Sequence, residues 1–95
     1  MNENIDDLTV QYEENGIVVI KELDKVVLSR GAWTTIVFRY QEWRQDIKDY
    51  GPDKYSIRRY RKMNGEYRYQ SKFTISSADQ AHKLIDALEG WLPKK

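Results

Sequence analysis

The apolar residues in the first half of the chain predict β-strands. Residues 17–20 and 26–28 are short runs of Ile, Val and Leu, and the charged stretch 21–25 (KELDK) separates them. Runs rich in β-branched residues favour strands, and a charged interval of this length fits either a turn or a bulge. This region is therefore predicted to form either one bent strand or two short strands, and the sequence fits both equally well.

A further strand is predicted from Trp33 to about Gln41, because its side chains alternate in character. One set comprises Ile36, Phe38 and Tyr40, and the other comprises Trp33, Thr35, Val37 and Arg39. The stretch that follows, RQDIKDYGPD, has the composition of a connection, and Gly51-Pro52 is its strongest break signal.

The pair Asn64-Gly65 lies between two runs of strand-forming residues and predicts a hairpin. A two-residue turn on this pair would mix apolar and charged residues on both faces. A type I turn at Met63-Asn64, with Gly65 in a left-handed bulge position, would set Tyr60 opposite Arg68. We favour this second register, because it separates an apolar face from a basic and aromatic one.

In the favoured register, one face of the hairpin is the core and the other is open. The core face contains Tyr55, Ile57, Arg59, Arg61, Tyr67, Tyr69, Ser71, Phe73 and Ile75. The open face contains Lys54, Ser56, Arg58, Tyr60, Lys62, Glu66, Arg68, Gln70, Lys72 and Thr74. If the preceding strand turns Ile36, Phe38 and Tyr40 toward the core, its other residues, Trp33, Val37, Arg39 and Trp43, join the open face.

The last twenty residues predict one amphipathic helix that covers the core face. Ser77 and Gln80 have capping-box spacing, and Gly90 followed by Pro93 ends the pattern. The apolar stripe consists of Ala81, Leu84, Ile85 and Leu88. His82 lies at the border of this stripe, where a structural or solvent-facing role is expected.

The length of 95 residues allows one domain, and a chain this short buries a modest share of its surface, so help from a partner subunit is plausible. We expect a flexible acidic N-terminal arm over residues 1–16 and a single β-β-β-β-α domain over residues 17–92. The predicted fold class is α+β, with a four-stranded antiparallel sheet followed by one C-terminal helix. No apolar run approaches membrane-spanning length, the N-terminus lacks the features of a secretory signal, and cysteine is absent. We therefore expect a cytoplasmic protein that does not enter a membrane.

Charge is distributed unevenly although the net charge is only +1. Residues 1–29 contain two lysines against seven acidic residues, and residues 30–72 contain eleven Lys and Arg against five acidic residues. A basic module with an acidic flank is typical of a face that binds polyanions. The alternative is that the cations keep solvated sheet edges from aggregating.

Single-stranded nucleic acid requires cations for its phosphates and flat rings for its unstacked bases. The predicted binding residues are the cations Arg39, Lys54, Arg58, Lys62, Arg68 and Lys72 and the rings Trp43 and Tyr60. For Trp33, packing in a dimer interface or against a cross-strand neighbour would explain the ring equally well. Trp91 is expected in the core or in a subunit contact.

Nothing in the sequence favours an enzyme. With one histidine and no cysteine, a Cys/His dyad is impossible, and a Ser/His/acid triad would have to use His82. The sequence has neither a glycine-rich phosphate loop nor a metal-ligand cluster. We therefore expect no catalytic residues, no metal, no cofactor and no small-molecule substrate.

The order strand, strand, hairpin, helix, together with the segments VVLSRGAW, GPDKYSIRRY and KFTISSADQ, resembles the positive cofactor four family of transcriptional coactivators, especially its bacterial single-stranded-DNA-binding members. The resemblance covers residues 17–88. It implies a homodimer of four-stranded sheets, each backed by its helix, that binds single-stranded DNA. It also implies that Arg58, Tyr60 and Trp43 match binding positions of the family. The connection at residues 44–52 is longer than usual, and the hairpin is more continuous.

The leading hypothesis is therefore a homodimeric single-stranded-DNA-binding protein with little sequence preference, acting in transcription or genome maintenance. RNA would be bound by the same chemistry. The alternative is a protein-interaction module whose basic and aromatic face meets an acidic partner. The acidic arm is a candidate competitor of nucleic acid for the basic sheet.

Overall fold

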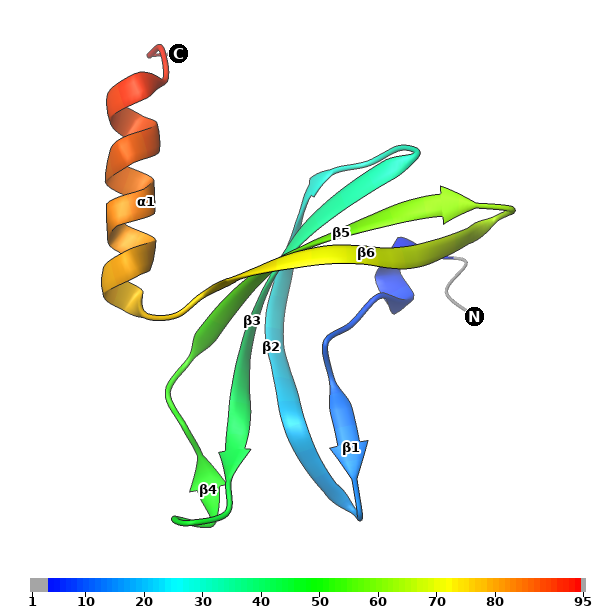
Figure 1. The fold of residues 1–95 in the computed structure, drawn as a ribbon, viewed down its shortest axis with the longest axis vertical. Helices are drawn as coiled ribbons and strands as arrows, with labels where there is room; N and C mark the ends of the chain where they lie inside the picture. The colour runs from blue at the N-terminus through cyan, green and yellow to red at the C-terminus, as the bar shows by residue number, and fades with distance from the viewer. Residues whose placement is uncertain (1–3, 95) are drawn as a thin grey trace.

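The computed structural model describes residues 4–94 and contains one curled antiparallel sheet and a C-terminal helix (Figure 1). The elements are the 3-10 helix η1 (Ile5–Asp7), β1 (Tyr12–Glu14), β2 (Ile17–Ser29), β3 (Trp33–Arg44), β4 (Asp49–Tyr50), β5 (Lys54–Met63), β6 (Glu66–Ile75) and α1 (Ala78–Trp91). The strand order is β1-β2-β3-β5-β6, and β4 pairs with the end of β3. Within residues 4–94, no helix combines the length and apolar character needed to cross a membrane.

The predicted α+β class with an antiparallel sheet and one C-terminal helix is confirmed, but the sheet has more than four strands. The predicted strands correspond to β2, β3, β5 and β6, and the short strands β1 and β4 are additional. β1 forms a hairpin with β2 through Asn15-Gly16, whose φ angles of 52° and 81° are both positive. This is a second Asn-Gly turn, which the polar composition of the N-terminal region concealed.

β2 is one bent strand rather than two short ones. Its pairing with β3 shifts between Glu22 and Asp24, so that Leu23 forms a bulge. The charged stretch between the two apolar runs is thus part of the strand, and the bulge increases its bend.

The register of the β5–β6 hairpin differs from the favoured one. Asn64 and Gly65 have φ angles of 53° and 80° and form a tight two-residue turn, which sets Tyr60 opposite Tyr69. Asn-Gly suits this turn because both positions require positive φ and the turn matches the twist of the strands. A bulge at Gln70 then shifts the register by one residue, because Arg59 pairs with Ser71. Beyond this bulge the residues are grouped on the two faces as predicted, but between it and the turn the faces of β6 are exchanged. The core lies on the face that was predicted to be open, because Ile36 and Phe38 pair with Arg58 and Ser56 instead of sharing a face with Ile57.

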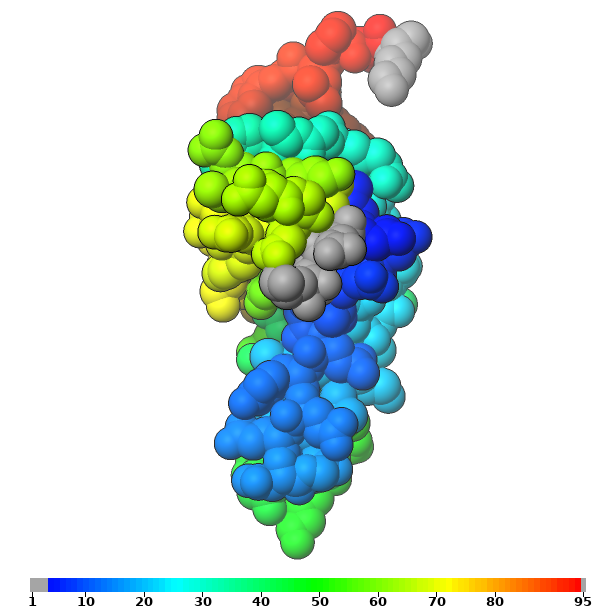
Figure 2. Space-filling view, turned by 90° about the vertical axis from the view of Figure 1, so that its right-hand side faces the viewer, coloured from blue at the N-terminus to red at the C-terminus, as the bar shows by residue number. Residues whose placement is uncertain are grey.

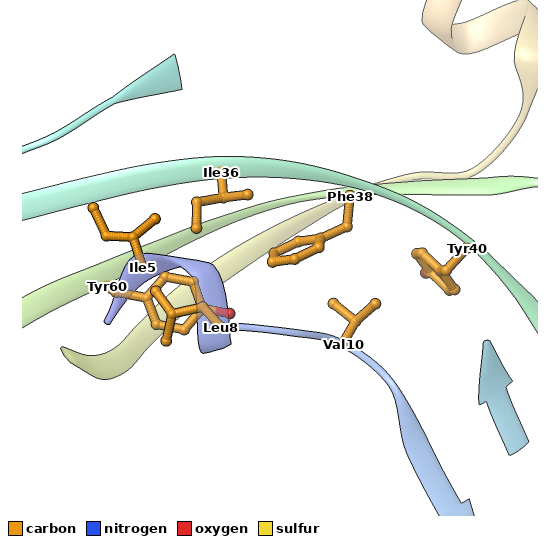
Figure 3. Packing of buried hydrophobic residues seen from close by; sticks show 7 residues of the cluster. All are labelled: Ile5, Leu8, Val10, Ile36, Phe38, Tyr40 and Tyr60. Carbon is orange, nitrogen blue, oxygen red and sulfur yellow. The ribbon is translucent and has the colours of Figure 1, made fainter. Parts of the chain in front are cut away.

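The hydrophobic core lies on one face of the sheet, which we call the inner face (Figure 3). β3 directs Ile36, Phe38 and Tyr40 to this face, and β5 adds Tyr60. The N-terminal segment covers these side chains with Ile5, Leu8 and Val10, which are at most 8% exposed. The core therefore lies between the sheet and the N-terminal segment.

Residues 4–16 consequently do not form the loose arm that was expected, and residues 1–3 of that arm lie outside the described part of the chain. Asn4 caps η1 by accepting a hydrogen bond from the backbone N–H of Asp6 at 3.0 Å. Lys25 Nζ donates to the carbonyls of Ile5, Asp6 and Leu8 at 3.3, 2.9 and 2.8 Å. Three buried apolar side chains and this lysine hold an acidic, polar segment against the sheet.

The expectation that the helix covers the core is wrong. Ser77 Oγ does accept from the N–H of Gln80 at 3.1 Å, so the predicted start of α1 is confirmed. The helix nevertheless stands beside the opposite, outer face and meets the sheet mainly at the end of β6 (Figure 1). Figure 2 shows it, in red, at one end of an elongated molecule, away from the blue N-terminal segment. Alternation alone could not show which face of the sheet the helix would take.

Candidate nucleic-acid interface

The eight predicted binding residues do not share one surface. Directly paired residues of antiparallel strands lie on the same face, so the pairings assign each side chain. The inner face receives Lys54, Arg58, Tyr60, Lys62 and Lys72. The outer face receives Arg39 and Arg68, and Trp43 lies at the far end of β3 beside β4.

Two of the predicted cations already have carboxylate partners. Arg39 forms an ion pair with Asp53, with 3.3 Å between Nη1 and Oδ2. Lys54 forms an ion pair with Glu42, and the hydrogen bond from this lysine to the carboxylate raises the pKa of Lys54. These two charges are therefore less available to phosphates than the prediction assumed.

The two predicted stacking rings have structural roles. Tyr60 is only 4% exposed beneath the N-terminal segment, so its prediction as an exposed ring is wrong. Burial raises the pKa of the Tyr60 phenol. Trp43 packs edge-on against Tyr50 with ring centroids 5.2 Å apart, and its Nε1 donates to Gln45 at 3.0 Å.

The hairpin and the start of β3 instead bring other rings and cations together. On the inner face, Arg58 lies 5.1 Å from the ring centroid of Tyr69, and Lys62 lies 5.4 Å from that of Tyr67. On the outer face, Arg59 and Arg61 lie 4.5 and 5.2 Å from the ring centroid of Trp33. Tyr69 and Trp33 remain 50% and 40% exposed.

The hairpin strands β5 and β6 contain seven Lys and Arg. Six of them, all except Lys54, have no salt bridge to any residue between 4 and 94, and we call these six the hairpin cations. They are Arg58, Arg59, Arg61, Lys62, Arg68 and Lys72. Their positive charges must therefore be neutralised by solvent ions or by a ligand.

Two pairs of hairpin cations are direct cross-strand neighbours. Arg58 pairs with Lys72 on the inner face, and Arg61 pairs with Arg68 on the outer face. Like charges placed opposite each other destabilise a sheet. Each pair lies close to a half-exposed ring, Tyr69 on the inner face and Trp33 on the outer face. The arrangement is unfavourable in the free protein and favourable once an anion is bound.

Sequence reasoning missed Tyr69, Arg59 and Arg61, which it assigned to the covered face, and left Trp33 undecided. The tight turn sets Tyr69 opposite Tyr60 on the inner face, and the bulge at Gln70 then brings Lys72 to the same face. The Asn-Gly pair signals the turn, but no glycine or proline marks the bulge. The position of the bulge could therefore not be predicted from the sequence.

Residues 4–94 contain no cluster of His, Asp and Glu that fits a metal ion. His82 is exposed on α1. No family model matches the chain, and no curated protein or solved structure is significantly similar to it. The resemblance to the positive cofactor four family is therefore neither supported nor contradicted by these comparisons.

Proposed function

We propose that the protein binds single-stranded DNA with little sequence preference, through the hairpin cations and the exposed rings of Tyr69 and Trp33. The observation that supports this proposal is the set of six cations without carboxylate partners, several of which contact aromatic rings. Lys and Arg neutralise phosphates without regard to sequence, and rings accept any unstacked base. Roles in transcription and in genome maintenance both fit such an activity.

On the inner face, Tyr69 would stack a base while Arg58 and Lys72 contact the adjoining phosphates. On the outer face, Trp33 with Arg61 and Arg68 forms a similar combination. β6 lies at the edge of the sheet, so a flexible single-stranded DNA that crosses this edge reaches both combinations. A stiff DNA duplex does not bend sharply enough to wrap around the β-strand at this edge.

The helix α1 is also poorly suited to bind a DNA duplex. α1 contains Asp79, Asp86 and Glu89 against a single lysine, Lys83. A recognition helix in a major groove presents cations and hydrogen-bond donors to phosphates and bases. The acidic character of α1 therefore favours single strands at the hairpin over a duplex at the helix.

The test compares Tyr69→Ala with Tyr12→Ala, because both rings are about half exposed on edge strands and only Tyr69 lies beside hairpin cations. Fluorescence anisotropy of a labelled oligo-dT would give the dissociation constants. Tyr69→Ala is expected to weaken binding by about 1–3 kcal/mol, the value of one stacked base, and Tyr12→Ala to leave it unchanged. Equal affinities for the two variants would contradict the proposed site.

Titration with oligo-U in the same assay separates DNA from RNA, because a preference for RNA would show as a lower dissociation constant for oligo-U. If the wild-type protein binds neither oligonucleotide, the nucleic-acid proposal is wrong. The unpaired cations would then favour the alternative of an acidic protein partner.

A further inference from the structure

Four apolar side chains form a row across the outer face of the sheet, exposed at its two ends and half-buried at Val37 and Ile57. Val26 pairs with Val37, Val37 with Ile57, and Ile57 with Phe73, so the row crosses β2, β3, β5 and β6 without interruption. Val26 and Phe73, at its two ends, are 55% and 56% exposed. We call these four residues the apolar row. A continuous apolar strip of this kind is typical of a covered surface.

The apolar stripe of α1 is exposed as well. Leu84, Ile85 and Leu88 are 36%, 48% and 43% exposed, and Trp91 in the last turn is 80% exposed. An isolated helix of 14 residues is only marginally stable in water, so α1 needs a packing partner for this stripe. Its own sheet does not provide that partner.

An open apolar groove separates the helix from the outer face. Its lining comes from Ala81, Leu84 and Ile85 on the helix and from Val37, Tyr55 and Ile75 on the sheet. The chain thus presents two apolar surfaces that face each other across an open space. A helix inserted between them would cover both.

The exposed area of the chain is large enough to account for a dimer. The accessible surface is 7115 Å² for a mass of 11.4 kDa, whereas a compact monomer of this mass exposes about 5,800 Å². The excess of roughly 1,300 Å² exceeds the ~800 Å² that each partner buries in a standard stable interface. The Cα radius of gyration of 15.3 Å likewise exceeds the ~12.4 Å expected for this length.

Charge also favours a second copy over other apolar partners. The polar side of α1 carries three carboxylates against one lysine. Arg59 lies beside the apolar row, because it is the next residue of β5 after Ile57 on the outer face. An acidic amphipathic helix therefore matches a basic sheet with an apolar centre, and the chain supplies both.

We infer that a second copy of this chain covers these surfaces, with α1 of each protomer docked in the groove of the other against its apolar row. The interface is reciprocal, as two-fold symmetry requires. It leaves Tyr69 and the inner-face cations free. This inference does not depend on the proposed binding of nucleic acid, and its test contains none, so either can fail alone.

The first measurement is the molar mass of the wild-type protein by light scattering during size-exclusion chromatography. The expected mass is twice 11.4 kDa, and a monomer at high micromolar concentration would overturn the inference. Leu88→Lys and Phe73→Asp each place a charge in the proposed contact and are expected to raise the dimer dissociation constant at least about thirtyfold. Leu88 belongs to the apolar stripe but does not line the groove beside its own helix. The matched controls Gly90→Lys and Thr74→Asp put the same side chains at neighbouring positions outside the stripe and the row and are expected to remain dimeric. A side chain added at Gly90 meets open space.

Mixing the two interface variants tests the exchange of helices. Each variant alone forms a dimer with two damaged contacts. A mixed dimer has one contact in which both surfaces are intact. Its second contact joins the introduced lysine to the introduced aspartate. Dimer mass is therefore expected to return in the mixture. If each helix packed against the sheet of its own protomer, mixing would not restore the dimer mass. Should either variant be unfolded alone, recovery of helical circular dichroism together with dimer mass on mixing supports exchange, and its absence overturns it.

Discussion

Two neighbouring tyrosines show how position decides the role of a residue. Tyr60 and Tyr69 are cross-strand partners on the inner face, with ring centroids 6.1 Å apart. Tyr60 is 4% exposed under the N-terminal segment, and Tyr69 is 50% exposed beyond it. The first ring therefore stabilises the core, and the second is free to stack a base. Composition does not distinguish them.

The buried phenol predicts a loss of stability in alkali. Burial raises the pKa of Tyr60 in the folded state, so the folded protein keeps this proton more tightly than the unfolded chain does. The associated stability is complete below the unfolded pKa of about 10 and is lost as the pH rises through the folded value. Urea unfolding at several pH values is expected to show a smaller alkaline loss of unfolding free energy for Tyr60→Phe than for the wild type. Parallel pH profiles would contradict this, since both proteins share the other six tyrosines.

At the scale of elements, the N-terminal segment completes the core. Val10, Leu8 and Ile5 supply one side of it, and Lys25 donates to backbone carbonyls in and just after η1. The Asn15-Gly16 turn makes this possible, because it folds the preceding residues back along β2. Since the segment is structural, its removal would damage the fold rather than simply relieve competition for the basic surface.

Leu8→Ala tests this role. Leu8 is fully buried, and replacing a buried leucine by alanine removes apolar contacts and leaves a cavity, at a cost of about 2–5 kcal/mol. Ile47→Ala is the control, because Ile47 is 53% exposed between β3 and β4; a change within about 0.5 kcal/mol is expected there. Urea unfolding measures both. A loss below about 1 kcal/mol for Leu8→Ala would show that the segment packs only loosely.

At the scale of the molecule, charges are separated although their sum is small. The carboxylates of Asp53, Asp46 and Glu42 pair with Arg39, Arg44 and Lys54, toward one end of the sheet. The hairpin cations lie toward the other end without such partners. A nearly neutral protein thereby presents one basic end, which is the end that we propose binds DNA.

This separation predicts how salt affects binding. Each cation that contacts a phosphate contributes about −0.7 to the slope of log K against log salt concentration for a single strand. Lys72→Ala is expected to make the slope for oligo-dT less negative by about 0.7. Arg39→Ala is the control and is expected to change the slope less, because Asp53 already neutralises Arg39. Equal changes in slope would show that the ion pairs do not decide which cations bind.

Local signals made several elements predictable. The helix start at Ser77, the hairpin around Asn64-Gly65 and the alternation in β3 each depend on neighbouring residues alone, and the structure contains all three. The turn of the hairpin is nevertheless the tight two-residue form instead of the favoured type I turn with a bulge. The concentration of cations in the hairpin is likewise a property of the sequence. Of the predicted binding residues, Arg58, Lys62, Arg68 and Lys72 remain in the proposed site.

The two faces of the sheet could not be told apart in this way. Both faces of β3 and β5 contain apolar residues, so either set was able to form the core, and only the packing of Ile5, Leu8 and Val10 selected the inner one. The bulge at Gln70 then placed Lys72 on the same face as Tyr69 and Arg58. The sequence alone therefore determined the four long strands, the position of the hairpin, the helix and the charge of the hairpin, because short-range interactions govern them. The tertiary structure alone decided which rings are buried and which cations are paired, because those outcomes depend on contacts between residues far apart in the chain.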